Sequence, residues 1–388
     1  MTFWLSAGII FTLGMVGFIM LKWGRVSCKG PSPTTPFTFI AILFTSGLDV
    51  GLIMFPLTEF PVYADTLKNP AYGFTNPLAI EFGFWGFLIW SFYFLTCFYF
   101  CILEPRVGFF KLKPVWLINN IVIIATCAFT AYLLLSNLPW YIPALAVING
   151  SPAVFTGIVF TVIALAVYSS TDLKYVRILS LSSSWLFLAL ITLLWCLAFV
   201  IGDYPANAYL STLALIGGYF TNIDHFILPI NDYHEFYLYW WFAWSIMIGQ
   251  FTSRFVGGLP TYQVFLAMVV VPSVPIALWF TVLYFYHLND IAINGLVNWA
   301  MIFVGVTFVV NSLDSLVRLY TENLGLTVER FGRTRYFLGN FIALSLLTLA
   351  FSGDFLEIQW IGAIVIGIMF FGFVFILGNK RAALHDIR

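Results

Sequence analysis

Two segments of the sequence carry tryptophan at spacings that place several aromatic rings on one side of a helix. At about 100° per residue, positions 85, 90 and 93 fall within an arc of about 140°, and positions 240, 241 and 244 within about 100°. The residues are Trp85, Trp90, Tyr93, Trp240, Trp241 and Trp244. Each aromatic face attracts a cation by about 0.5–2 kcal/mol, so these rings suit a quaternary ammonium group, which has no N–H to donate. Spacing alone leaves helix packing or a membrane-interface belt as the alternative.

A second candidate for chemistry is Asp49, which lies in an apolar stretch between Gly47 and Gly51. The two glycines and Pro56 weaken a helix here, and unwound backbone at membrane depth is tolerated only beside a cavity or inside protein. A carboxylate in the middle of a span costs about 2.5–3.5 kcal/mol. We expect its partner to be a proton, a metal ion or a cationic substrate, because no Lys or Arg lies in the core of a predicted span. The alternative is a protonated Asp49 bonded to a backbone carbonyl.

The elements that must position these residues are membrane helices. Of the 388 residues 61% are hydrophobic and 9% are charged, whereas a soluble domain has roughly 25% charged residues. A spanning helix needs about 20 mostly apolar residues. Eleven stretches qualify: 3–22, 36–57, 79–102, 115–136, 152–169, 180–201, 235–256, 262–287, 295–316, 334–351 and 356–378. The sequence therefore predicts an all-α polytopic membrane protein, with a short surface helix over 206–220.

The distribution of positive charge predicts the orientation. If the segment after the first helix is cytoplasmic, the cytoplasmic side receives 16 of the 17 Lys and Arg residues and the outer side receives only Lys68, as the positive-inside rule requires. The N-terminus is then outside and the C-terminus in the cytoplasm, in a plasma (inner) membrane. The first helix lacks a basic start, so it is not expected to be a cleaved signal peptide. A net charge of zero gives no sign of nucleic-acid binding.

Eleven helices divide into one plus five plus five. Because five is odd, two successive five-helix units lie upside down relative to each other, an inverted repeat that places a binding site at mid-membrane. We expect a leading helix and loop (1–34), a first repeat (35–202), an outer connection (203–234), a second repeat (235–378) and a short cytoplasmic tail (379–388).

Several motifs together resemble the betaine/carnitine/choline transporter family. Segment 239–254 is similar to its signature of Tyr-x-x-Trp-Trp-x-x-Trp followed by Phe-Ile-Ala-Arg, and residues 85–93 repeat its Trp, four residues, Trp, two residues, Tyr pattern. Segment 47–59 is similar to its Gly-x-Gly-x-Gly stretch with a downstream Glu-Pro, 172–182 to its link into a following helix, and 311–315 to its Thr-Ser-x-Asp-Ser motif. The matches follow the family's order from about residue 20 to 315.

The resemblance implies a five-plus-five inverted-repeat fold, alternating access, a substrate route lined by the six aromatic residues above, and a homotrimer. In sodium-coupled members an ion site uses carbonyls of the broken helix and hydroxyls of the Thr-Ser motif. By position this site corresponds to Thr45, Leu48, Phe308, Asn311 and Ser312. The coupling ion is then Na⁺ or H⁺, with no cofactor, no metal centre and no catalytic residue.

Departures from the family pattern are also informative. Members usually have twelve helices, and this sequence lacks the first; the proline of the seventh-helix motif is replaced by Ser245-Ile246, which puts a helix break there in doubt. The loop 255–260 lacks the usual basic residues, and Asn311 replaces a Thr. Asp49 stands where Gly is usual. A carboxylate there attracts a cation and repels a substrate's own carboxylate, which favours choline over betaine or carnitine.

The predicted function is secondary active transport of a quaternary-ammonium solute. A sensor that binds without transporting is one alternative, and a transporter of other amines or amino acids with the same fold is another. A membrane enzyme is less favoured, because no nucleophile–base spacing stands out. His225 and His234 lie near Asp224, Asp232 and Glu235, where solvated loop residues are a better interpretation than a metal site.

Overall fold

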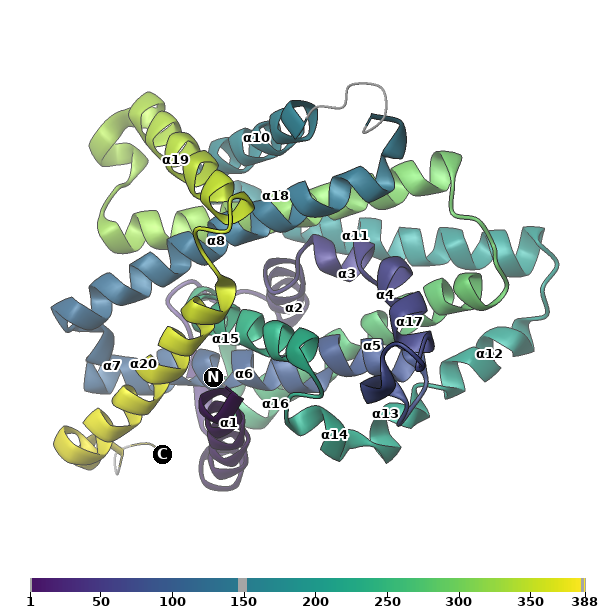
Figure 1. The fold of residues 1–388 in the computed structure, drawn as a ribbon. Coiled ribbons are helices and arrows are strands. Elements are labelled where there is room, and N and C mark those ends of the chain that lie inside the picture. The colour runs from purple at the N-terminus through teal and green to yellow at the C-terminus, as the bar shows by residue number, and fades with distance from the viewer. Residues whose placement is uncertain (1, 146–151, 385–386, 388) are drawn as a thin grey trace.

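The computed structural model describes residues 2–145, 152–384 and 387, and within these ranges its regular secondary structure is helical apart from one two-stranded sheet. The helices, labelled as in Figure 1, are α1 (Thr2–Trp23), α2 (Pro36–Ser46), α3 (Val50–Met54), α4 (Pro56–Ala64), α5 (Pro77–Trp85), α6 (Phe87–Phe98), α7 (Glu104–Val107), α8 (Lys113–Tyr141), α10 (Pro152–Ser169), α11 (Lys174–Cys196), α12 (Ala206–Ala214), α13 (Gly217–Thr221), α14 (Ile223–Ile227), α15 (Asp232–Thr252), α16 (Thr261–Phe265), α17 (Val271–Leu288), α18 (Gly295–Leu324), α19 (Val328–Ser352) and α20 (Ile358–Asn379). The strands are β1 (Ser27–Lys29) and β2 (Gly257–Pro260), paired antiparallel.

The predicted fold class, an all-α polytopic membrane protein, is confirmed. Within the described residues, eight helical runs are long and apolar enough to cross a membrane. The other three expected spans correspond to shorter or more polar elements. Span 36–57 is divided into α2, α3 and part of α4, span 152–169 is α10, and span 235–256 is α15, whose tyrosines and tryptophans lower its hydropathy. The expected surface helix over 206–220 is divided into two helices, α12 and α13.

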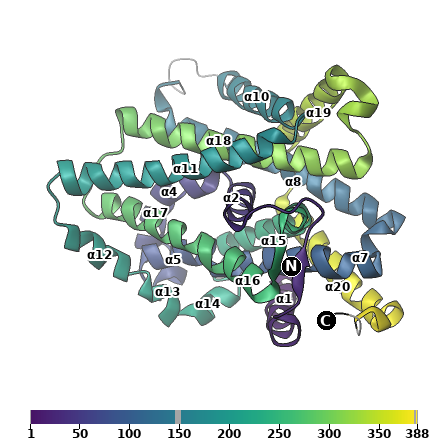
Figure 2. The same cartoon turned by 180° about the vertical axis from the view of Figure 1, so that it is seen from behind.

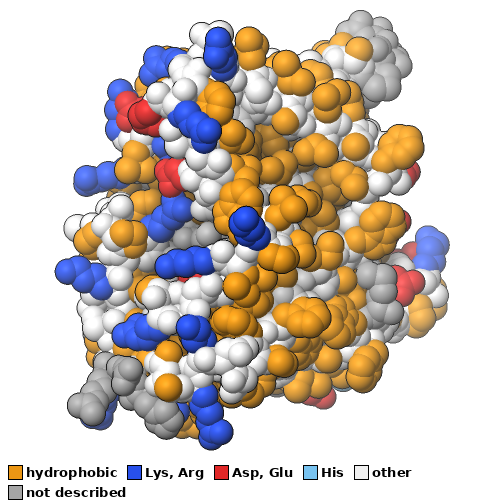
Figure 3. Space-filling model, turned by 90° about the vertical axis from the view of Figure 1, so that its left-hand side faces the viewer, with side chains coloured by type: hydrophobic (Ala, Val, Ile, Leu, Met, Phe, Trp, Pro, Cys, Tyr) orange, Lys and Arg blue, Asp and Glu red, His pale blue; other side chains and the backbone are white. Residues whose placement is uncertain are grey.

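Charge is distributed unevenly between the two ends of the helix bundle. We call the surface formed by residues 22–35, 104–113, 170–177, 252–262 and 318–335 the basic face, and the surface formed by 64–76 and 202–232 the opposite face. Figure 3 shows Lys and Arg gathered toward one side, next to a broad hydrophobic surface. On the basic face, β1 pairs with β2 and Arg254 forms an ion pair with Glu322. The short segment 255–260 therefore contacts the first loop.

Two predicted spans differ in continuity. The expected helix 79–102 is interrupted at Gly86, whose ψ of −153° is extended, so α5 ends at Trp85 and α6 begins at Phe87. The single arc predicted for Trp85, Trp90 and Tyr93 is therefore wrong, because a helical wheel assumes one continuous helix. In contrast, α15 runs unbroken through Ser245 and Ile246, as the missing proline suggested.

Helix packing partners occur in matching pairs. In the first half α11 packs against α2, and in the second α20 packs against α15; α10 packs against α18, and α19 against α8. Figure 1 shows α8 running alongside α18, and Figure 2 shows α11 on the other side of α18. If the two halves have the same helix order, corresponding helices in each half pack against corresponding partners. The inverted relation of the two units stays a prediction.

Small residues let α15 approach its neighbours closely. A Cβ on Gly249 would lie 2.1 Å from Oγ1 of Thr96 on α6, and a Cβ on Gly362 of α20 would lie 2.2 Å from the carbonyl oxygen of Tyr239. The Thr96 hydroxyl also donates to the carbonyl oxygen of Ser245, at 2.6 Å. These backbone contacts fix α15, and with it the tryptophans that it carries.

We expect Gly362→Val to lower the stability of the purified protein by about 1–3 kcal/mol, because overpacking a closely packed contact costs about that much. The measurement is the apparent Tm in detergent together with the monodisperse fraction in size-exclusion chromatography. Gly378→Val on the same helix is the matched control, since nothing lies within 4 Å of its Cβ position. Equal behaviour of the two variants would contradict this account of the packing.

Candidate functional site

The centre of the candidate site is the unwound segment between α2 and α3. Helix α2 ends at Ser46 and α3 begins at Val50, and Asp49 between them has an extended backbone with φ −133° and ψ −160°. The Gly51 N–H donates to Oδ1 of Asp49 at 2.8 Å, so this carboxylate caps α3. Asp49 is fully buried, and its Oδ2 atom has no hydrogen-bond partner. One oxygen thus holds the break in place, and the other is left for a cation or a proton.

Side chains from two other helices satisfy the carbonyl groups that the break releases. Tyr93 of α6 donates to the carbonyl oxygen of Gly47 at 3.2 Å. The hydroxyl of Ser312 on α18 lies 2.6 Å from the carbonyl oxygen of Leu48 and 3.2 Å from that of Thr45. Hydrocarbon offers no donors, so unwound backbone in a membrane needs such partners within the protein. The folded protein therefore supplies hydrogen-bond donors for the carbonyl groups at the break.

The predicted ion-site residues largely come together at this point. Thr45, Leu48, Asn311 and Ser312 are joined by hydrogen bonds, including one from Nδ2 of Asn311 to Oγ1 of Thr45 at 2.8 Å. The amide oxygen of Asn311 instead accepts from Ser180 of α11, at 3.2 Å. Phe308 contributes its ring, which packs edge-on against Phe44. The Ser312 hydroxyl has one hydrogen to donate to two nearby carbonyl oxygens, so it cannot satisfy both at once. The cluster therefore has oxygen lone pairs that could bind a cation.

The six predicted aromatic residues divide into two groups and a separate residue. Trp85, Trp240 and Trp241 form one group, which we call the tryptophan cluster, with ring centroids 4.5–5.7 Å apart. Trp90 and Tyr93 form the second group, with centroids 5.4 Å apart and perpendicular rings. Trp244 is fully buried on α15, and its indole N–H has no hydrogen-bond partner.

The broken helix lies against both groups of rings through its two glycines. A Cβ on Gly51 would lie 2.7 Å from the Trp85 ring, and a Cβ on Gly47 would lie 3.2 Å from Tyr93 and 3.3 Å from Trp90. Asp49 is between these two glycines in sequence. The structure thus brings the carboxylate and both aromatic groups to one unwound segment, with rings that contact one another in this conformation.

Two further carboxyl groups belong to this region, and neither was predicted as a site residue from the sequence. Glu81 of α5 and Glu59 of α4 are both buried, and Glu59 accepts hydrogen bonds from Tyr63 and Tyr237, each at 2.8 Å. An acidic residue inside a predicted apolar stretch is a signal in itself, and Glu81 lies within the expected span 79–102. Asp49 drew attention because glycines flank it on both sides, whereas Glu81 has a glycine, Gly83, on one side only.

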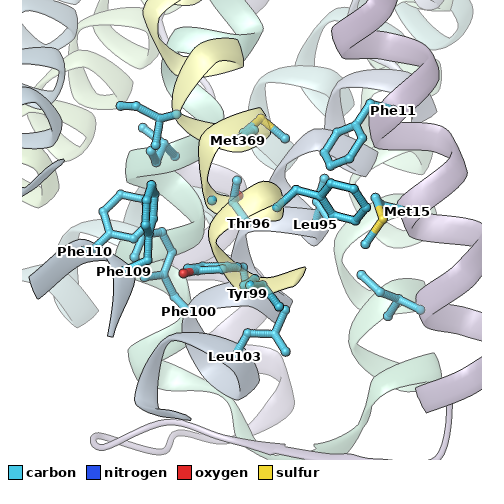
Figure 4. Close-up of a pocket in the computed structure, with 16 residues that line it drawn as sticks. Phe11, Met15, Leu95, Thr96, Tyr99, Phe100, Leu103, Phe109, Phe110 and Met369 are labelled. Carbon is cyan, nitrogen blue, oxygen red and sulfur yellow. The ribbon is translucent and has the colours of Figure 1, made fainter. Parts of the chain in front are cut away.

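Other candidates prove to be structural. A pocket between α1, α6 and α20 is lined almost entirely by apolar side chains such as Phe11, Leu95 and Met369 (Figure 4), and no carboxylate reaches it. His225 stacks on Phe74 and His234 on Phe84. His234 is buried within α15, so its interpretation as a solvated loop residue is wrong. Among the described residues, no three His, Cys, Asp or Glu side chains are grouped as metal ligands would be.

Comparison with curated proteins gives distant relatives. The chain is 26% identical over 327 residues to an uncharacterized transporter of Haemophilus influenzae (strain ATCC 51907 / DSM 11121 / KW20 / Rd). The match covers 73% of this chain and 46% of that protein. The chain is 22% identical over 292 residues to an uncharacterized transporter of Mycobacterium tuberculosis (strain ATCC 25618 / H37Rv), covering 63% of this chain and 47% of that one. No family model matches the chain.

This chain is similar to transporters. It spans about half the length of the curated relatives that it matches. The relatives' names agree with a multi-pass membrane protein and with the expectation that the chain is not an enzyme. These names do not state a substrate.

Replacing Asp49 in two ways separates its structural role from its charge. We expect Asp49→Ala to lower the free energy of unfolding by about 0.5–2 kcal/mol through loss of the helix cap, and Asp49→Asn to stay close to wild type, because Asn caps a helix about as well as Asp. The measurement is the apparent Tm in the absence of ligand. If the two variants lost the same stability, the carboxylate charge rather than the cap would be holding the segment.

Proposed function

We propose that this protein is a secondary active transporter of a quaternary-ammonium cation, with choline as the leading example, and that it works by alternating access. The observation that carries the proposal is the buried Asp49 carboxylate, with one oxygen unpartnered, on a broken membrane helix that packs against two groups of aromatic rings. A quaternary ammonium needs negative charge and aromatic faces rather than hydrogen-bond acceptors. The printed names of the relatives support the transporter class.

Charge balance favours a substrate with a net positive charge. None of the ion pairs among the described residues involves Asp49. A buried carboxylate without a counter-ion is costly, and a bound cation would supply one. Betaine and carnitine bring a second carboxylate, which would need its own donor close to Asp49. Choline has no carboxylate.

The tight packing of the rings is consistent with an occluded, substrate-free conformation. Trp240 and Trp241 stack with centroids 4.5 Å apart, so a trimethylammonium group would have to separate rings of the cluster in order to bind between them. Alternating access requires the two helix units to move relative to each other, which would open this contact from either face. Binding and movement are thereby coupled.

Sodium is one candidate coupling ion. Sodium prefers oxygen ligands, and the carbonyl oxygens of Thr45 and Leu48 converge on the Ser312 hydroxyl. A cation there would draw together α18 and the end of α2, as coupling requires. The assignment of the basic face to the cytoplasm of an inner membrane, with the N-terminus outside, belongs to the same proposal, as does a homotrimer.

The test is tracer uptake into proteoliposomes of choline, betaine and carnitine, each with a sodium gradient, a proton gradient of either direction, or no gradient. We expect accumulation of choline, and a loss of affinity of about two- to thirtyfold in Trp241→Leu, since removing one ring contact of about 0.5–2 kcal/mol changes affinity by that factor. Trp185→Leu is the matched control, because Trp185 is 60% exposed on α11. Saturable binding without uptake would indicate a sensor, and neither binding nor uptake would contradict the proposed substrate.

Selectivity should depend on the charge of Asp49. In Asp49→Asn, we expect the ratio of choline to betaine uptake to fall by about tenfold or more, because one lost charge interaction of 1.4 kcal/mol corresponds to that factor. Asp224→Asn, at an exposed position on α14, should leave the ratio unchanged. An unchanged ratio in Asp49→Asn would show that the carboxylate does not contact the substrate.

A further inference from the structure

Glu81 is a fully buried carboxyl group that interacts with the side chains of Glu59, Tyr63 and Trp85. It lies in α5, four residues before Trp85, and its side chain is fully inaccessible. Neither of its carboxyl oxygens has a hydrogen bond of standard geometry. Burying an ionised carboxylate in this way is very unfavourable, so such a group carries a proton or has a cation beside it.

Glu59 lies beside Glu81 and has the opposite environment. The two carboxyl groups are close enough to interact electrostatically. The Glu59 carboxylate accepts hydrogen bonds from three tyrosine hydroxyls, those of Tyr63, Tyr233 and Tyr237. Three donors stabilise a charged carboxylate. The donors are therefore divided unequally, with three hydrogen bonds to Glu59 and none of standard geometry to Glu81.

Two adjacent buried carboxyl groups cannot both be ionised without a positive partner. None of the ion pairs among the described residues includes either Glu59 or Glu81. Among the described residues, the titratable groups that interact with the pair are tyrosines: Tyr63 of α4, Tyr72 of the turn Pro70–Tyr72, Tyr141 of α8, and Tyr233 and Tyr237 of α15. Phe60, the next residue of α4 after Glu59, packs against Tyr284 and His287 of α17.

A pocket connects Glu59 with the opposite face. It is lined by Thr58, Glu59, Asn69, Asp232 and Tyr233, together with three neighbours. Tyr233 is 40% exposed, although its hydroxyl donates to Glu59. A proton can thus pass between solvent and the pair across a single tyrosine side chain, whereas Glu81 has no contact with the surface.

The inner member of the pair adjoins the tryptophan cluster. Glu81 interacts with the Trp85 side chain as well as with Glu59, and Trp85 contacts Trp241 with centroids 4.9 Å apart. A cation among these rings would lie next to Glu81. Its positive charge would favour the ionised form of that carboxyl and so expel the proton.

We infer that Glu59 and Glu81 form a proton-binding site that exchanges one proton with the opposite face and that is emptied when an organic cation binds at the tryptophan cluster. The linkage to the cation rests on the proposed function. The pair holds one proton, on Glu81, when the cluster is empty. When the cation binds, the proton leaves through Glu59 and the pocket, and the charge of the site is conserved. Transport is then an exchange of one proton for one monovalent cation.

Reciprocal linkage sets the sign of the pH effect. If cation binding expels one proton, choline affinity must rise with pH, by up to about tenfold per pH unit in the range where the pair titrates. An acidic liposome interior should then drive choline uptake, whereas a symporter would need an acidic exterior. In Glu81→Gln the side chain imitates the protonated acid, so choline affinity should stay at its low-pH value throughout.

The first experiment measures choline affinity against pH by quenching of tryptophan fluorescence in wild type and Glu81→Gln. Glu104→Gln is the control, because Glu104 is a partly buried glutamate that accepts a hydrogen bond from the Tyr99 hydroxyl but lies at the basic face. The pH dependence should be present in wild type and in Glu104→Gln, and absent from Glu81→Gln. Choline binding that is independent of pH in wild type would overturn the inference and leave the proposed function standing.

The second experiment does not need a substrate. Infrared difference spectra of the purified protein between acidic and alkaline pH should contain a C=O stretching band of a buried carboxylic acid that is missing in Glu81→Gln and retained in Glu104→Gln. If choline fails to bind at any pH, the proposed substrate is wrong, and this band alone decides whether the proton site exists. Absence of the band from wild type, or its replacement by a sodium-dependent signal that requires Glu81, would overturn the proton site.

Discussion

Unwound backbone inside a membrane must find its hydrogen bonds within the protein, and the region around Asp49 is organised by that requirement. Hydrocarbon cannot hydrogen-bond the groups that a broken helix releases. Tyr93 bonds to Gly47 and Ser312 to Leu48, so α6 and α18 are held to the break by the same contacts that make it tolerable. The Asp49 side chain then caps α3 and restarts the helix. Removing the break would leave these polar side chains without partners, which is why the segment and its surroundings form one unit.

The same unit concentrates negative charge and aromatic faces where hydrocarbon would otherwise exclude charge. A carboxylate at the centre of a span costs about 2.5–3.5 kcal/mol, and this protein buries Asp49, Glu59 and Glu81 in the region around the rings. Structural packing alone would be served better by apolar residues of similar volume. A cation that enters among the rings offsets part of that cost. A proton on the glutamate pair offsets it when the cation is absent, and the two states then alternate.

The sequence predicted much of the fold and part of the site. Apolar length and the asymmetry of Lys and Arg indicated a polytopic helical protein, and the glycines flanking Asp49 indicated the break between α2 and α3. The grouping of the tryptophans was missed, because Gly86 interrupts the helix between Trp85 and Trp90 and a wheel cannot anticipate this. The tyrosines around Glu59 come from α4 and α15. The two from α15 are 174 and 178 residues from Glu59 in sequence, and such long-range contacts leave no local pattern. Glu81 could have been found by its charge alone.

The central claim is that a cation, rather than a molecule of the same shape, is bound beside Asp49. The most direct measurement is equilibrium binding of choline and of its neutral isostere, in which carbon replaces the quaternary nitrogen, to the same purified protein under the same conditions. The two molecules bury nearly the same apolar surface, so a hydrophobic pocket would bind them alike. The account predicts that choline binds at least about a hundredfold more tightly, since two or more ring contacts and one carboxylate together supply roughly 3 kcal/mol. Equal affinity would contradict it.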